Sequence, residues 1–178
     1  MIQERGLIVT SDKEVKQTIE DNKWNLLCEH PDPAVVSVFR ELYANGMERD
    51  EYNIFVKGKW VPFDWTTINN YYGLDNVEDE EYHAILDNDA TNWDAIRDEL
   101  CKVSVPWKRY TNGGLKSFAS QAMTRTSKIW HYFVCAKLLP TTNFNDVVKN
   151  KAALVYAIQK KKKLDIGLII QNSIIHGF

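Results

Sequence analysis

Short apolar patterns at helical spacing, each followed by a residue that ends a helix, limit this chain to a mainly helical fold. Apolar residues recur three and four positions apart, which is the spacing of one helix face. The clearest predicted helix runs from Thr124 to Leu139, and Pro140 ends it. Asn145 or Asp146 should cap the next helix and Asp165 the last one. We therefore expect a compact, mainly α domain of about seven or eight helices.

Residues 53–63 have the features of a β-hairpin instead. Two runs of β-favouring residues flank Lys57-Gly58, and a glycine in a two-residue turn is typical of hairpins. Asp64 should then cap a short helix that Gly73 ends. An isolated hairpin is only marginally stable in water, so we expect this one to pack on the helices. It is the one small hairpin that the sequence predicts.

The segment from residue 104 to residue 123 has no strong pattern of either kind. Pro106 and Asn112-Gly113-Gly114 predict a loop over 104–114, and residues 115–123 are expected to form a short helix. The length suits a single domain over 1–178, and this loop is the best internal boundary. Because the chain stops at Phe178, directly after a strongly apolar helix, we expect it to be a piece of a longer protein.

Charge is divided along the chain at the same loop. Residues 1–106 hold 22 Asp and Glu against 10 Lys and Arg, whereas residues 107–178 hold 2 against 12. The formal net charge of the whole chain is only −2. Either an acidic part (1–106) and a basic helical part (107–178) pack together and neutralise each other, or the basic part offers a binding face.

The basic part contains the residues that we expect to contact nucleic acid. Trp107-Lys108-Arg109-Tyr110 places two cations between two rings, and such a segment can hold phosphates and stack on bases. The alternative for Trp107 is a packed loop anchor. The lysine run 160–163 ends a helix, where cations also suit the helix dipole. The candidate set is Trp107, Lys108, Arg109, Tyr110, Lys116, Lys149, Lys151, Lys160, Lys161, Lys162 and Lys163.

No motif for catalysis or for a cofactor occurs in the sequence. Phosphate-binding, zinc-protease and serine-hydrolase motifs are absent, so we predict no catalytic residue, no cofactor and no small-molecule substrate. His131 and Cys135, four residues apart, share a helix face and in principle suit a metal; a histidine beside a core cysteine is the simpler interpretation, and we predict no metal site. The three widely spaced cysteines favour a reducing compartment, nucleus or cytoplasm. No apolar run approaches roughly 18 residues, so we expect no contact with a membrane.

Motifs spread over nearly the whole chain carry a family resemblance. The residues concerned are Arg5-Gly6-Leu7-Ile8, Trp24-Asn25-Leu26-Leu27-Cys28, Val38-Phe39-Arg40-Glu41-Leu42-Tyr43-Ala44-Asn45, Val56-Lys57-Gly58-Lys59-Trp60-Val61-Pro62-Phe63, Ile68-Asn69, Tyr72-Gly73-Leu74, Lys128-Ile129-Trp130, Phe133-Val134-Cys135-Ala136-Lys137-Leu138-Leu139-Pro140-Thr141, Leu154-Val155-Tyr156-Ala157-Ile158, Asp165-Ile166-Gly167 and Ile169-Ile170-Gln171-Asn172. With these residues in this order, the chain resembles the family named putative plant transposon protein domain, which occurs in plant retroelement-associated reading frames. It is more weakly similar to the plant mobile domain. The resemblance implies a plant source and a mobile-element origin, and it implies no catalytic residues.

Three functions remain open at this point. The leading hypothesis is a non-enzymatic, mobile-element-derived module that binds DNA or RNA through a basic C-terminal face. The second is a protein-interaction or self-association module, in which the acidic part meets the basic part of another copy or the apolar last helix pairs. The third is the remnant of a metal-dependent nuclease or recombinase, which requires carboxylates that converge on two metal ions.

Overall fold

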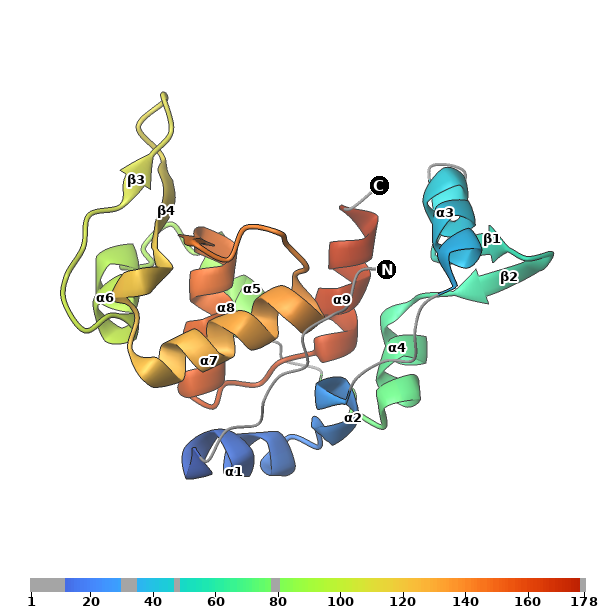
Figure 1. Ribbon diagram of the computed structural model, residues 1–178, viewed down its shortest axis with the longest axis horizontal. Coiled ribbons are helices and arrows are strands. Elements are labelled where there is room, and N and C mark those ends of the chain that lie inside the picture. Colours follow the sequence, from blue (N-terminus) through green and yellow to red (C-terminus); the bar gives the residue numbers. More distant parts are fainter. Residues whose placement is uncertain (1–11, 30–34, 47–48, 78–80, 177–178) are drawn as a thin grey trace. The chain divides into compact units, whose positions relative to one another are not determined.

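Helices make up most of the computed structural model (Figure 1), which describes residues 12–29, 35–46, 49–77 and 81–176. The mainly α prediction is confirmed, with nine α-helices in these ranges. Their bounds are α1 (Lys13–Asp21), α2 (Asn25–Cys28), α3 (Val36–Asn45), α4 (Trp65–Tyr72), α5 (Glu81–Asp87), α6 (Trp93–Leu100), α7 (Arg125–Phe133), α8 (Lys149–Gln159) and α9 (Ile166–Ile175).

In the described part of the chain the strands form two antiparallel sheets, so the prediction of one hairpin as the only β-structure is wrong. The predicted hairpin is present as β1 (Asn53–Val56) and β2 (Lys59–Pro62). A second sheet has the order β3-β4-β5, formed by β3 (Lys108–Arg109), β4 (Leu115–Ala119) and β5 (Asp146–Val148).

Two sequence predictions fail at this second sheet. Residues 115–119 form β4 rather than the start of a short helix, because Phe118 pairs with Val147 and both side chains are completely buried. Asp146 lies in β5 and does not cap α8; the residue before α8 is Val148, which has no capping side chain. Burial of β4 against β5 therefore overrides the weak local preferences of both segments.

The contacts divide the chain into two compact units, which are described separately. Among the described residues, 19–76 with 165–176 form the first unit and 12–18 with 77–164 form the second. The change of charge sign at residues 106–107 falls inside the second unit. Each unit therefore consists of segments that are far apart in the sequence.

In the first unit, the β1–β2 hairpin packs on helices, as its marginal stability requires. Ile54, Val56 and Phe63 form a buried apolar cluster. Val38 and Leu42 of α3 and Ile174 and Ile175 of α9 pack against this cluster. The apolar side of the last helix is therefore used inside this unit.

Helices α4 and α9 of the first unit begin as the sequence predicts. The carboxylate of Asp64 caps α4 by accepting from the Thr67 amide at 3.0 Å, and Gly73 ends this helix with φ 66°. Asp165 caps α9 by accepting from the Leu168 amide at 2.9 Å. Hydrogen bonds to Thr66 and Thr67 hold the pKa of Asp64 at about 2, so its carboxylate stays charged.

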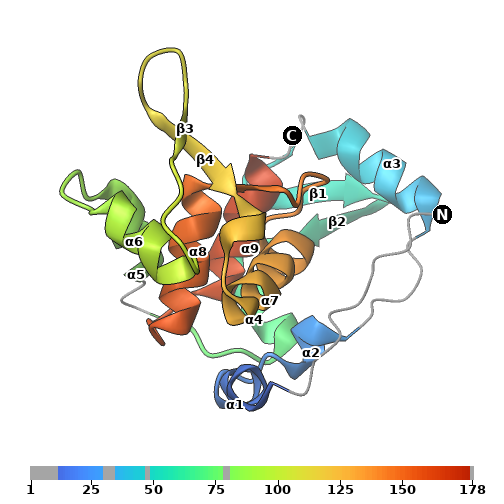
Figure 2. The ribbon, with the colours of Figure 1, turned by 60° about the vertical axis from the view of Figure 1, so that its left-hand side comes forward.

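In the second unit, α8 lies at the centre, and α5, α6 and α7 pack around it (Figure 2). Side chains of α8 from Ala152 to Val155 are completely buried, which explains its weakly amphipathic sequence. Thr124 caps α7 by accepting from the Ser127 amide at 3.2 Å. The predicted helix from Thr124 to Leu139 is confirmed, and its last turn, Val134–Leu138, has π-helical geometry.

Candidate nucleic-acid interface

The β3–β4 hairpin extends away from the helices of the second unit (Figures 1 and 2). Its base is fixed by Trp107, whose ring meets that of Phe118 edge to face with centroids 5.0 Å apart. Trp107 is only 8% exposed, so it is a packed anchor and offers no ring for stacking on a base. Of the two interpretations of Trp107, the structure therefore supports the structural one.

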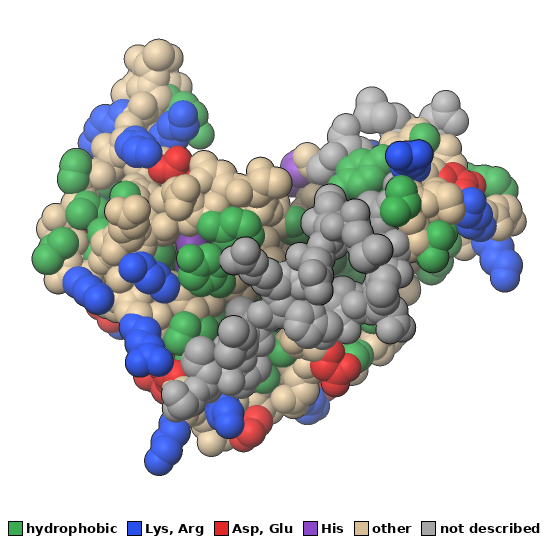
Figure 3. Space-filling view, viewed as in Figure 1, with side chains coloured by type: hydrophobic (Ala, Val, Ile, Leu, Met, Phe, Trp, Pro, Cys, Tyr) green, Lys and Arg blue, Asp and Glu red, His purple; other side chains and the backbone are tan. Residues whose placement is uncertain are grey.

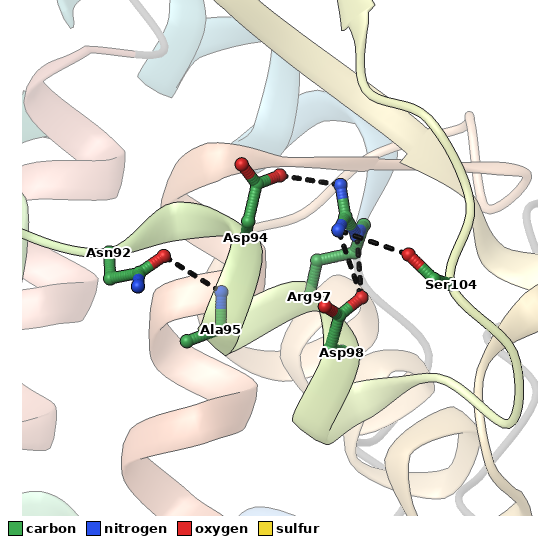
Figure 4. Close-up of polar contacts among 6 residues, drawn as sticks. All are labelled: Asn92, Asp94, Ala95, Arg97, Asp98 and Ser104. Carbon is green, nitrogen blue, oxygen red and sulfur yellow. Dashed lines mark hydrogen bonds and ion pairs between the residues drawn. The ribbon is translucent and has the colours of Figure 1, made fainter.

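The chain that leads into β3 is attached to helix α6 through Arg97 (Figure 4). The guanidinium pairs with Asp94 at 2.5 Å and with Asp98 at 2.9 Å, and it donates to the Ser104 hydroxyl at 3.2 Å. The hydrogen bond from Arg97 lowers the pKa of Asp98, with a further contribution from Ser104. Because Arg97 is nearly buried, this cluster fixes the start of the segment that ends in the hairpin.

Cations and one ring gather on the hairpin itself. Lys108, Arg109, Tyr110 and Lys116 are all exposed, and Figure 3 shows a group of Lys and Arg side chains below the uncharged tip of the hairpin. The Arg109 guanidinium donates to the Gly113 carbonyl at 2.8 Å, which keeps it on the hairpin. The ammonium of Lys116 lies 5.6 Å from the centre of the Tyr110 ring. This exposed set is called the hairpin patch below.

One carboxylate, that of Asp146 on β5, lies beside the hairpin patch. It accepts from the Lys108 ammonium at 2.6 Å and from the side-chain amide of Asn143 at 3.1 Å. These two hydrogen bonds lower the pKa of Asp146, and the charges of Lys108 and Lys116 add to the shift. Asp146 therefore stays ionised and partly neutralises the patch at its base.

The lysine run at the end of α8 is largely neutralised by acidic residues from the front part of the sequence. Lys160 pairs with Glu99 of α6 at 2.6 Å, and Lys162 pairs with Glu81 of α5 at 2.8 Å. The other oxygen of Glu81 accepts from the Lys163 amide at 2.8 Å. Within this unit, the acidic and basic parts of the sequence thus pack together. The charge of Lys163 also helps to lower the pKa of Glu81, after the hydrogen bonds from Lys162 and from the Lys163 amide, and Lys161 keeps an exposed side chain with no ion pair to the described residues.

Two further candidates are also used inside the second unit. The Lys149 ammonium lies 4.3 Å from the centre of the Trp93 ring on α6. Lys151 is only 7% exposed, because it lies on a buried side of α8. From the sequence alone, both residues were predicted to contact nucleic acid in the same way as the cations of the hairpin. In the structure, both are less accessible to a phosphate than those cations.

His131 and Cys135 form a buried pair rather than a ligand set. The Cys135 sulfur lies 3.7 Å from each ring nitrogen of His131, and Nε2 lies 3.2 Å from the Phe144 carbonyl oxygen. Burial lowers the pKa of His131, and burial raises that of the Cys135 thiol. The prediction that Cys135 is buried is confirmed. The described residues contain no group of three or more His, Cys, Asp or Glu side chains suited to a metal ion.

The sequence missed the residues that position the hairpin. Nothing in the local pattern marked Asp146 or Trp93 as partners of Lys108 and Lys149, which lie far away from them in the sequence. Arg97 has its partners Asp94, Asp98 and Ser104 nearby in the sequence, but spacing alone did not mark them as a cluster that attaches the loop. As for membranes, none of the described helices combines the length and the apolar character that a span needs.

Comparison with protein families identifies a family for most of the chain. Residues 20–177 match the family model described as Putative plant retrotransposon-related domain. Comparison with the curated proteins and with the solved structures gives no significant match. Because the matched residues cover most of the two units, the chain belongs to the plant retrotransposon-related domain family.

Proposed function

We propose that this retrotransposon-related domain is a non-enzymatic module that binds nucleic acid through the hairpin patch. The observation that carries the proposal is the gathering of Lys108, Arg109 and Lys116 around the exposed ring of Tyr110. Cations at this spacing can contact successive phosphates, while an exposed ring can stack on an unpaired base.

The proposed binding site contains fewer residues than the candidate set predicted from the sequence. Lys160 and Lys162 are paired with carboxylates, Lys151 is buried, and Trp107 is an anchor. These residues contribute to the unit that carries the hairpin and make no contact with the ligand. Cys28, Cys101 and Cys135 form no disulfide with one another in the described part of the chain, which accords with a role in the nucleus or cytoplasm.

The proposed ligand is single-stranded DNA or RNA in preference to duplex. Tyr110 is 53% exposed and can stack only on a base that is not already stacked within a helix. Binding should weaken as salt increases, because each phosphate contact releases a counterion. Fluorescence anisotropy with labelled single-stranded and duplex oligonucleotides, measured over a salt series, tests both expectations.

Variants of the hairpin patch locate the site. Arg109→Ala/Lys116→Ala should weaken binding and reduce the slope of log affinity against log salt by roughly 1.5, since each phosphate contact contributes about 0.7–0.9. The matched control is Lys13→Ala/Lys16→Ala, which removes two exposed lysines of α1 and should leave the slope unchanged. Equal losses in the two double variants would mean that only total charge matters, and the proposal would then be wrong.

A further inference from the structure

The β1–β2 hairpin of the first unit carries two aromatic rings on the face opposite its core. Phe55 is 41% exposed and Trp60 is 55% exposed, and the two residues are direct cross-strand partners. Their rings meet edge to face with centroids 5.3 Å apart. Ile54 and Val56, on the other face of β1, are buried in the core cluster. A pair of large exposed rings on a small sheet marks an interaction surface.

One edge of this two-stranded sheet is closed and the other is open. Helix α3 closes the β1 edge: the Asn45 side-chain amide donates to the Phe55 carbonyl at 2.6 Å, and the Glu41 carboxylate accepts from the Lys57 amide at 2.9 Å. All four residues of β2 are exposed, and β2 has β1 as its only strand neighbour in the described part of the chain. An open edge is a template for pairing with another strand.

The turn between the strands determines which backbone groups point toward the open edge. Lys57 and Gly58 both have positive φ, 51° and 76°, as a two-residue type I′ turn requires. Val56 and Lys59 therefore form a hydrogen-bonded pair, and the next pair, Phe55 and Trp60, does not. The amide and carbonyl of Trp60 thus point outward from β2. Pro62 faces the same way and has no N–H, so donors for strand pairing are confined to a short stretch around Trp60.

We infer that the β2 edge is a self-association surface, on which β2 of a second copy pairs in antiparallel orientation with Trp60 opposite its equivalent. A two-fold axis at this position makes the surface self-complementary, since each Trp60 donates to and accepts from the other. Lys59 then faces Val61 of the second copy, so no like charges oppose each other across the new pair.

The same register joins the exposed rings. Phe55 and Trp60 of both copies form a row of four rings on one face of a four-stranded sheet, and two marginal hairpins become one larger sheet. The inference does not depend on the hairpin patch, because it concerns the other unit of the chain. Its success or failure leaves the proposed nucleic-acid site as it stands.

Sedimentation equilibrium over a range of concentrations tests the inference. We expect a monomer–dimer equilibrium in the parent chain, and we expect Trp60→Ser to raise the dimer dissociation constant roughly tenfold or more. The matched control is Tyr71→Ser, which removes a 73% exposed ring from α4 of the same unit and should leave the equilibrium unchanged. A parent chain that stays monomeric, or a dimer that Trp60→Ser does not weaken, would overturn the inference. The inference would also be overturned if the parent chain were monomeric and Trp60→Ser lowered its affinity for an oligonucleotide. The exposed rings would then contact nucleic acid instead of a second copy.

Disulfide cross-linking tests the register. In a Cys28→Ser background, chains carrying Lys59→Cys and chains carrying Val61→Cys are mixed and oxidised. Positions 59 and 61 face each other across the proposed two-fold axis as a non-hydrogen-bonded pair, whose separation suits a disulfide. We expect a cross-linked dimer in the mixture and none from Val61→Cys chains alone. A cross-link that forms equally well without the Lys59→Cys chains would contradict the proposed register.

Discussion

Replacement of Gly167 by alanine should push apart helices α4 and α9, because a side chain at this position of α9 would meet the backbone of α4. A Cβ at residue 167 would lie 2.2 Å from the Trp65 carbonyl oxygen and 2.6 Å from Asn69 Oδ1. The same approach supports two hydrogen bonds, since the Gly167 amide donates to Asn69 Oδ1 at 2.8 Å and the Trp65 amide donates to Gln171 Oε1 at 2.7 Å. The added methyl group therefore cannot be accommodated without moving one backbone away from the other.

The cost follows from these contacts. Overpacking costs about 1–3 kcal/mol, and the loss of a buried hydrogen bond costs about 1–3 kcal/mol. Alanine is favoured over glycine inside a helix by about 1 kcal/mol, which offsets part of the loss. We expect Gly167→Ala to lower the free energy of unfolding by about 1–5 kcal/mol, measured by urea denaturation with tryptophan fluorescence.

Gly114→Ala is the matched control for this substitution. Its new Cβ would meet the end of the Asn112 side chain at 3.1 Å, which can move, and the Tyr110 ring at 3.9 Å, an ordinary van der Waals contact. We expect a change within about 0.5 kcal/mol there. If Gly167→Ala were as stable as the parent chain, the close contact between α4 and α9 would not exist.

Three further predictions concern the second unit. Asp146→Asn should tighten oligonucleotide binding severalfold at low salt, because it removes the carboxylate that neutralises Lys108; an unchanged or weaker affinity by fluorescence anisotropy would argue against contact at the hairpin patch. Arg97→Met should lower the free energy of unfolding by about 1–2 kcal/mol, because it removes the bonds to Asp94, Asp98 and Ser104. In the same urea titration, the control Lys102→Met, at an exposed position, should have little effect. Stability should also fall as pH decreases below the ordinary His131 pKa of 6.5, because burial and then the nearby Lys151 lower the pKa of His131, so only the unfolded chain takes up this proton. Urea titrations between pH 7.5 and pH 5.5 should show this loss, and a His131→Asn variant with the same slope against pH would contradict its assignment to His131.

The sequence was most informative where structure is decided locally. Asp64, Thr124 and Asp165 cap helices through their own side chains, and the Lys57-Gly58 turn needs only two residues with positive φ. Each of these features depends on neighbours within a few positions. For this reason the main helices and the first hairpin could be predicted without knowledge of the fold.

The second sheet and the pairing of charges could not be predicted in this way. β4 pairs with β5 across an intervening helix, and the lysine run meets Glu81 and Glu99 from more than sixty positions away. Exposure of Lys108 and burial of Lys151 depend on the same long-range packing. The sequence therefore showed that the candidate cations lie in the C-terminal part of the chain. Which of them are exposed and unpaired could be seen only from the fold.

An NMR titration of the labelled chain with a single-stranded oligonucleotide tests the central claim most directly. The amide signals of residues 108–118 should shift progressively as oligonucleotide is added. Those of Lys160 and Lys162 should stay in place, because Glu99 and Glu81 already pair with these two lysines. Shifts confined to residues 160–163, or no shifts anywhere at low salt, would contradict the account.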